Sequence, residues 1–473
     1  MLKRILNSKT RSISWASLIL AVFTFFSALL GLLRDRLLAG SFGLSGELDI
    51  YYAAFRIPDF ISMVLIMGAI SAAIVPVFSQ YLTRSKKEAW DFLANLFNIF
   101  LLILIIVLFF LFIFTPRLIS FIAPGFNSEK RELTILLTRI MLLSPLLLGL
   151  SNIISAILQV FQRFFITSLA PIMYNLGIIT GILFFAPRFG ISGLAWGVVL
   201  GAFLHLSIQL PVLLDRGFRL QKIFRFFDPG FLKVIKLTIP RSIGLAANQI
   251  NLIVVTAIAS TLFTGSIAVF NLAQSLSRPF LTLIGVSFST AAFPALSLAF
   301  AKKEKEKFEN IFFSTFWRVF FLIAPLSLLL FLFRNLIVDI ILRAGRFGQP
   351  EARLTAACLG VFALAVFAQS LILLLAKSFY SLHDTKTPAL ASIGGMTVNI
   401  ILAFSLVKLF SFSNSLSRFF LNFFSLDNPL KVKIIALPLA VSFSALFQLA
   451  LLLFFFYKRI KKMRQEREEI NKV

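Results

Sequence analysis

Long apolar runs separated by short polar breaks recur along almost the whole chain, from Ile13 to Tyr457. Each run approaches the ~20 residues that an α-helix needs to cross the ~30 Å hydrocarbon core of a bilayer. The pattern predicts about twelve membrane-spanning helices and three amphipathic or interfacial segments. The predicted spans are residues 13–38, 58–82, 91–114, 133–158, 165–187, 191–214, 238–263, 266–299, 309–333, 353–377, 388–409 and 434–457, and the interfacial segments are 47–57, 115–125 and 411–431.

The composition favours the same class of protein. Hydrophobic residues make up 59% of the 473 residues and charged residues only 14%, whereas a soluble domain carries about 25% charged residues. The first apolar stretch, Ile13 to Leu33, has no small-residue cleavage site and runs into Arg34 and Asp35. We therefore expect a first span there and not a cleavable signal peptide. The predicted fold class is an all-α integral membrane protein.

The net charge of +26 is placed in a way that indicates membrane topology. Lys and Arg residues gather in short loops between apolar spans and form no single basic face, which argues against nucleic acid as a partner. Basic loops stay on the cytoplasmic side, so we expect a bacterial inner-membrane protein with both termini in the cytoplasm. The basic gaps are 84–87, Arg163, 216–236, 302–307, Lys386 and 458–472, and the exception is the gap after the ninth span, with Arg343, Arg346 and Arg353.

An internal repeat is found when the sequence is shifted by 218 residues, which lays Ser71–Pro76 on Ser289–Pro294. Both segments end in basic loops. Six predicted spans precede the basic linker and six follow it, which predicts two parallel six-helix lobes around a central cavity, as in alternating-access transporters. The predicted domains are an N-terminal lobe (1–214), a basic cytoplasmic linker (215–237), a C-terminal lobe (238–458) and a basic cytoplasmic tail (459–473).

The linker alternates Arg and Lys with Phe between Arg216 and Phe227. Polybasic segments beside membrane spans bind anionic lipids, so we expect this stretch to lie on the membrane surface. A regulatory role is the alternative.

Ionisable side chains within spans are costly, at ~2.5–3.5 kcal/mol each on insertion scales, and therefore tend to face an aqueous cavity or a partner. Arg34 and Asp35 are neighbours about 100° apart on a helix, so we expect them not to pair with each other. Gly31, one turn before Arg34, would let a helix or a ligand headgroup approach. The alternative is that Arg34 snorkels to the outer headgroups. The candidates are Arg34, Asp35 and Arg36 in the first span, Asp49, Arg56 and Asp59 near the second, Arg139 in the fourth, and Arg241 and Arg278 in the seventh and eighth.

Polar residues in the seventh and eighth spans are further candidates. Asn248 and Gln249 occupy different faces of a helix, so contact with a ligand and hydrogen bonding between helices are both open. Arg278 precedes Pro279, where we expect a local helix break that presents carbonyl groups as well as a cation. Arg139 is expected to anchor its span.

The sequence lacks the common signatures of enzymes. One cysteine, Cys358, cannot form an internal disulfide, and the two histidines are far apart in sequence. No phosphate-binding glycine loop, nucleophile elbow or catalytic carboxylate pair is found. We expect a transporter with no cofactor, and coupling to the membrane potential or to a cation is open.

Several motifs resemble the MurJ (MviN) family, in order along nearly the whole chain. The first are Gly31-Leu-Leu-Arg34-Asp35 and the stretch from Asp49 to Asp59. The most specific runs from Ala376 to Pro388. The others are Gly68-Ala69 to Pro76, Gly193-Leu-Ala-Trp-Gly197-Val-Val-Leu-Gly201, Gln209-Leu-Pro211, Pro240-Arg241, Asn248-Gln249-Ile-Asn251 and Arg343-Ala-Gly345-Arg-Phe347.

The resemblance implies a MATE-like member of the multidrug/oligosaccharidyl-lipid/polysaccharide superfamily. It also implies a flippase that moves lipid II, the undecaprenyl-pyrophosphate-linked precursor of peptidoglycan, from the inner to the outer leaflet. The cell-wall synthesis machinery is then an expected partner. The residues expected to contact the lipid-linked pyrophosphate are Arg34, Asp35, Asp49, Arg56, Arg241, Asn248, Gln249 and Arg278.

The chain departs from the family pattern at several positions. Ala28, Ser62 and Ser275 stand where the family has cavity arginines, and Val255 stands for an aspartate. Typical members also continue with two more helices after the twelfth span. These departures favour two alternatives: a flippase for another polyprenyl-linked glycan, and a non-transporting scaffold. A cation-coupled drug exporter is disfavoured because the expected cavity is rich in arginine and poor in carboxylates.

Overall fold

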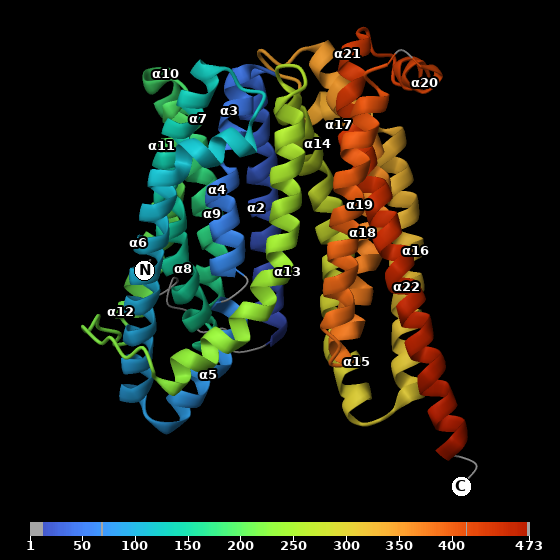
Figure 1. Ribbon diagram of the computed structural model, residues 1–473. Helices are drawn as coiled ribbons and strands as arrows, with labels where there is room; N and C mark the ends of the chain where they lie inside the picture. Colours follow the sequence, from blue (N-terminus) through green and yellow to red (C-terminus); the bar gives the residue numbers. More distant parts are fainter. Residues whose placement is uncertain (1–12, 68–69, 413, 471–473) are drawn as a thin grey trace. The chain divides into compact units, whose positions relative to one another are not determined.

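The computed structural model describes residues 13–67, 70–412 and 414–470 (Figure 1). Within these ranges the chain is helical and contains no strand, which confirms the all-α class. Nine helices of the described part are long and apolar enough to cross a membrane. They coincide with nine predicted spans, and the remaining three spans fall on α2 (Ile13–Phe42), the α4–α5 segment and α13 (Pro229–Ser260). The count of twelve stays a prediction.

The chain forms two compact units, Met1–Thr261 and Leu262–Val473. The first unit includes α13, which bends along its length (Figure 1). The repeat-based domain boundaries stay a prediction. The other elements of the first unit are α2, α3 (Gly46–Ala54), α4 (Arg56–Ile61), the π-helix η1 (Ser62–Met67), α5 (Ile70–Arg84), α6 (Lys86–Ile122), α7 (Ser128–Met141), α8 (Leu143–Val160), α9 (Phe164–Thr180), the π-helix η2 (Gly181–Phe185), α10 (Ala186–Phe189), α11 (Ser192–Ser207) and α12 (Leu210–Leu214).

In the second unit, helix α18 (Gln349–Ser381) forms the buried centre. It packs against α14, α16 and α22, and most of its apolar window is buried. The remaining elements are α14 (Ser266–Phe280), the π-helix η3 (Leu281–Val286), α15 (Ser287–Ala301), α16 (Lys305–Leu332), α17 (Arg334–Ile341), α19 (Lys386–Leu409), α20 (Ser415–Phe423), α21 (Pro429–Val432), the 3₁₀ helix η4 (Lys433–Ile435) and α22 (Ala436–Ile470).

The repeat seen in the sequence is also visible in the helices. Pro76 lies inside α5 and Pro294 inside α15. A π-helical segment precedes each of them, η1 in the first unit and η3 in the second. The 218-residue shift moves η1 to within one residue of η3, so the two halves share this local distortion as well as their motif. Single-turn π segments are rare and often lie at functional sites.

A ladder of glycines brings α9 and α11 into backbone contact. Gly177 and Gly181 face Gly201 and Gly197, and a Cβ atom added at Gly197 would lie 2.6 Å from the Cα of Gly181. Without a hydrophobic driving force between helices in lipid, close approach through small residues is a main source of helix association. The glycines spaced by four in this motif are therefore required for packing.

Replacing Gly197 by alanine is expected to destabilise the first unit. The added methyl group overlaps backbone and cannot be relieved by a rotamer change, so we expect a loss of at least ~1–3 kcal/mol. Thermal unfolding of the detergent-solubilised protein measures this. Gly394→Ala is the matched control, because its Cβ would meet nothing closer than 3.7 Å. Equal unfolding temperatures for the two variants would contradict the packing role.

The three predicted interfacial segments differ in how well they agree with the structure. Residues 47–57 do not form an exposed amphipathic helix: α3 packs against α7 and buries most of its side chains, including Asp49. Residues 115–125 mostly continue α6 to Ile122, so no separate surface helix exists there. In 411–431, α20 is strongly amphipathic and exposes Phe419 and Phe423, as a helix on a membrane surface would.

The most specific sequence motif, Ala376 to Pro388, forms the turn between α18 and α19. His383 has a positive φ of 59°. Asp384 then accepts hydrogen bonds from Thr387, at its backbone nitrogen (2.9 Å) and at its hydroxyl (2.7 Å). This aspartate thereby satisfies a free amide of the first turn of α19. The motif is explained by how a tight helix connection is built.

Candidate functional site

Arg34 and Asp35 form an ion pair, so the expectation that they cannot pair was wrong. Arg34 Nε and Nη2 donate to Asp35 Oδ1 at 3.0 and 2.8 Å. Helix geometry separates the two Cβ atoms, but the arginine side chain is long enough to fold back sideways onto its neighbour. Asp35 is buried, whereas the side chain of Arg34 is 26% exposed. The side chain of Arg34 is therefore only partly buried.

A second helix holds Arg34 in place. Its Nη1 donates to Asn175 Oδ1 of α9 at 3.3 Å. Asn175 Nδ2 donates back to α2 at Ser27 Oγ (3.2 Å) and lies 3.2 Å from the carbonyl of Pro171. The asparagine thus links α2 to α9 beside the cation. Asn175 was not among the residues predicted from the sequence; the available signal was an amide side chain within a predicted span.

Gly31 lies one turn before Arg34 and has open space beside it. A Cβ added at Gly31 would meet no atom of the described residues within 4 Å, so no described helix packs closely against this glycine. Approach of a ligand to Gly31 stays a prediction.

Arg56 lies in a different environment. It is 5% exposed at the start of α4, and its Nε donates to Thr256 Oγ1 of α13 at 2.7 Å. A buried, hydrogen-bonded guanidinium ties two helices together. The arrangement is that of a structural contact within the first unit, and solvent has little access to it.

The formal charge of the ionisable residues on α2 to α4 is less positive than the sequence suggested. Arg34, Arg36 and Arg56 give three positive charges, and Asp35, Glu47, Asp49 and Asp59 give four negative ones, so the set sums to −1. Helices α2 to α4 therefore supply no net positive charge for an anionic ligand.

The polar residues of the seventh span are split between faces, as expected. Asn248 is exposed and Gln249 is 7% exposed. The side chain of Arg241 lies outside the described residues. Arg139 lies against α6, with its guanidinium carbon 4.6 Å from the centre of the Phe112 ring. This contact fits the anchoring role expected for it.

Arg278 belongs to the second unit and is exposed on α14. Its Nη2 donates to Gln274 Oε1 at 3.4 Å, one turn back on the same helix. The expected helix break at Pro279 was wrong, because α14 continues to Phe280 and the distortion is the π segment that follows. Ser275, one turn before Arg278, donates its hydroxyl to Leu272 O and carries no charge.

A buried polar network crosses the first unit between α8 and the end of α11. Ser151 Oγ lies 2.7 Å from His205 Nδ1 and donates to the His205 carbonyl at 3.0 Å. Gln209 Nε2 donates to the same carbonyl at 3.1 Å. The backbone amide of Gln209 bonds instead to Leu206, so these side chains satisfy a carbonyl left free where α11 ends. The network is structural.

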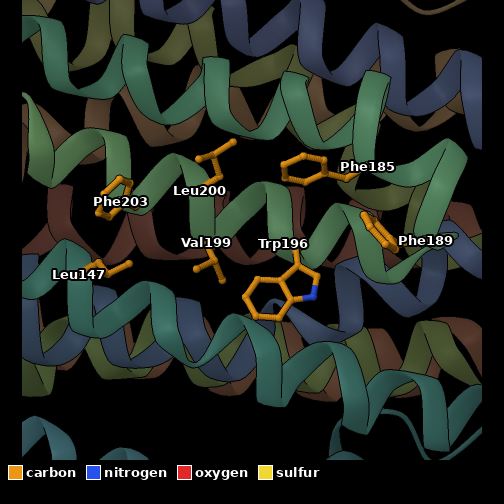
Figure 2. Close-up of a pocket in the computed structure, with 7 residues that line it drawn as sticks. All are labelled: Leu147, Phe185, Phe189, Trp196, Val199, Leu200 and Phe203. Carbon is orange, nitrogen blue, oxygen red and sulfur yellow. The ribbon is translucent and has the colours of Figure 1, made fainter.

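An apolar groove of about 480 Å³ lies on the first unit (Figure 2). Helix α11 contributes most of its lining. The lining residues are Leu147, Phe185, Phe189, Trp196, Val199, Leu200 and Phe203. The indole nitrogen of Trp196 is the single side-chain polar atom among these seven. A groove of this chemistry does not recognise a diphosphate, so it is distinct from the Arg34 site.

The fold is similar to that of a solved membrane transporter. An inward-facing MATE transporter of the MOP superfamily superposes with a TM-score of 0.75 at 13% identity, covering 95% of this chain and 99% of that chain. Together with the membrane-length helices, this likeness shows that the chain has a multi-pass, MATE-like fold.

The chain belongs to the MurJ family. The family model described as lipid II flippase MurJ matches residues 38–471. A probable lipid II flippase MurJ of Buchnera aphidicola is 30% identical over 79% of this chain and 73% of its own length. The lipid II flippase MurJ of Burkholderia cenocepacia is 28% identical over 81% of this chain and 76% of its own length. A MurJ structure in an inward closed conformation matches with a TM-score of 0.77 at 26% identity, covering 94% of this chain and 90% of that chain. The protein is accordingly a multi-pass protein of the inner membrane.

Proposed function

We infer that this chain translocates lipid II from the inner to the outer leaflet of the inner membrane. The observation that carries the inference is the match to the MurJ family over residues 38–471, with a MurJ structure as a structural neighbour over nearly the whole chain. Lipid II joins a pyrophosphate to a polyprenyl tail and a glycan. Such a substrate requires a cationic contact inside a membrane protein, and Arg34 is a partly exposed cation of this kind.

We propose that the pyrophosphate competes with Asp35 for Arg34. Asp35 takes two of the guanidinium donors through one oxygen, and Asn175 takes another. A phosphate oxygen that binds the exposed edge would gain a charge-assisted hydrogen bond without removing Asn175. The ion pair would keep the guanidinium compensated when no substrate is bound, which lowers the cost of a cation within the membrane.

The net charge of −1 on helices α2 to α4 supports a requirement for more cations. Arg278 is the exposed candidate in the second unit, whereas Arg56 is buried against α13. Asp49, Asn248, Gln249 and Arg241 remain proposed substrate contacts. The uncharged residues at Ala28, Ser62 and Ser275 favour a second candidate, a flippase for a different polyprenyl-linked glycan. The scaffold alternative predicts no translocation of either substrate.

We propose that the membrane potential assists transport. Lipid II is anionic, and an interior-negative potential favours outward movement of negative charge by ~2.3 kcal/mol per charge per 100 mV. Collapse of the potential with an ionophore should therefore slow translocation. Anionic lipids and the cell-wall synthesis machinery are the other proposed partners.

Both termini are expected to lie in the cytoplasm. The even-numbered gaps are basic, and an even number of spans returns the chain to its starting side. Reporter fusions after Lys462 should be active as cytoplasmic reporters, and fusions near Gly265 should be active as periplasmic ones. A periplasmic report from the C-terminal fusion would overturn this topology.

Replacement of a known lipid II flippase by this gene tests the proposed function in cells. If the inference holds, cells depleted of their own flippase should grow and should not accumulate lipid II. Lysis with accumulated lipid II, despite normal levels of this protein in the membrane, would reject it. Deletion of the gene in its own host then separates the candidates: loss of a surface glycan with an intact wall would identify the second one.

A further inference from the structure

Residues 216–227 of the basic linker are folded against helix α6. We call these residues the basic strap. Asn95 Nδ2 donates to the carbonyl of Arg225 at 3.0 Å, and the Arg225 amide donates back to Asn95 Oδ1. Asn98 Nδ2 donates to the carbonyls of Gln221 (2.6 Å) and Ile223 (3.0 Å). Since the strap is not helical in this region, two asparagines supply partners that its backbone would otherwise lack.

Apolar contacts fix the strap further. Phe218 is 3% exposed, and its ring centre lies 5.9 Å from Trp90 and 6.1 Å from Phe97. At the far end, Asp228 caps α13 by accepting the amide of Phe231 at 2.9 Å. The strap is therefore held along its length and has one side turned away from the lobe.

That outward side combines cations with bare apolar groups. Arg219, Lys222 and Arg225 are exposed at every third position, and the strap contains no acidic residue. Between and after these cations the strap exposes large apolar side chains, of which Phe227 is the most exposed at 89%. The exposed apolar residues are Leu220, Phe224, Phe226 and Phe227. Cations beside unpacked phenylalanines are the chemistry of a membrane surface, where charge meets phosphate and rings enter the acyl boundary.

The position along α6 places the strap at the edge of the bilayer. The last pinning residue, Asn98, precedes Leu102, where a run of exposed apolar side chains on α6 begins. Four residues of α-helix span about 6 Å, which is about the thickness of the headgroup layer beside the apolar belt. Nucleic acid or an acidic protein would satisfy the cations but would leave the phenylalanines in water.

We propose that the basic strap is a binding surface for anionic phospholipid headgroups, held in its binding shape by Asn95 and Asn98. The occupant is a phospholipid of the leaflet that the strap faces. Arg219, Lys222 and Arg225 contact the headgroup, and the exposed phenylalanines enter the acyl region. This assignment does not depend on the transported substrate, since it concerns lipid bound at the surface of the first unit.

Native mass spectrometry of the full-length, detergent-solubilised protein tests the proposal, with phosphatidylglycerol and phosphatidylcholine as probes. The triple variant Arg219→Gln, Lys222→Gln, Arg225→Gln should lose affinity for phosphatidylglycerol by about tenfold or more, because each near-surface cation contributes to headgroup attraction. Affinity for phosphatidylcholine should change little. A matched control, Lys302→Gln, Lys303→Gln, Lys386→Gln, removes three exposed cations from other loops and should change both affinities less than about threefold.

A second pair of variants separates shape from charge. Asn95→Leu with Asn98→Leu keeps every cation and releases the strap, so preference for phosphatidylglycerol should fall. Phe226→Ser with Phe227→Ser keeps the cations and the two asparagines, and it should lower the affinity for both lipids. Equal losses in the strap and control triples would overturn the proposal, since binding would then follow net charge alone. An unchanged affinity in the strap triple would overturn it as well. Thermal unfolding shows that each variant is folded, and none of these readouts requires translocation.

Discussion

Arg34→Ala is expected to abolish lipid II translocation. The substitution removes the partly exposed guanidinium of the first unit, and the loss of a charge-assisted contact of ~2–3 kcal/mol corresponds to about a 30- to 150-fold loss of affinity for the pyrophosphate. Arg34→Lys should restore at most part of the activity, because an ammonium group cannot serve Asp35, Asn175 and a phosphate with a planar fork. Growth of flippase-depleted cells measures the effect.

The control for this prediction follows from the ion pair. Arg34→Ala removes the cation that pairs with the buried Asp35, and an unpaired buried carboxylate lowers the stability of the protein. The double variant with Asp35→Asn removes that carboxylate charge and should restore membrane levels without restoring growth. Normal translocation by Arg34→Ala would contradict this role. It would favour the alternative in which Arg34 reaches the outer headgroups and anchors its helix.

Arg278→Ala is expected to be as damaging as Arg34→Ala. One guanidinium that is already paired cannot neutralise a pyrophosphate in a medium of low dielectric, so we expect further cations to be required. Arg278 is exposed and lies one turn from Ser275, the position where the family resemblance predicts an arginine. Ser275→Arg combined with Arg278→Ala should therefore regain function by returning the charge to that turn. Complementation and membrane levels are measured together.

The matched control is Lys408→Ala, which removes an exposed cation from the end of another span in the same unit. It should leave growth unchanged. If Arg278→Ala leaves growth unchanged, Arg278 does not replace the family arginine at the position of Ser275. That result would favour the hypotheses of a different substrate and of a non-transporting scaffold.

The spans were predictable because bilayer thickness imposes a length on each apolar run, and every predicted span overlaps a helix. The repeat was predictable from Ser71–Pro76 and Ser289–Pro294 because both halves keep the same proline-containing turn. The π segments beside them were not, since the sequence pattern carries no period that marks a single widened turn.

The site was only partly predictable. Arg34 and Asp35 stood out because charges within spans are costly. Their mutual pairing was missed because Cβ directions do not describe a side chain with several rotatable bonds. Asn175 was missed because its role arises from packing of α9 on α2, across 148 residues of sequence from Ser27. The burial of residues 47–57 was not predicted because α7 covers α3, which local amphipathicity cannot reveal.

Outward exposure of lipid II in right-side-out membrane vesicles directly measures translocation by this chain. The vesicles come from cells in which this chain is the sole candidate flippase, and a membrane-impermeant amine reagent labels the peptide of lipid II that has reached the outer surface. We predict labelling at the level given by a known lipid II flippase, and background labelling with Arg34→Ala. Background labelling with the wild-type chain, at normal membrane levels and with unchanged thermal unfolding, would contradict the claim that it translocates lipid II.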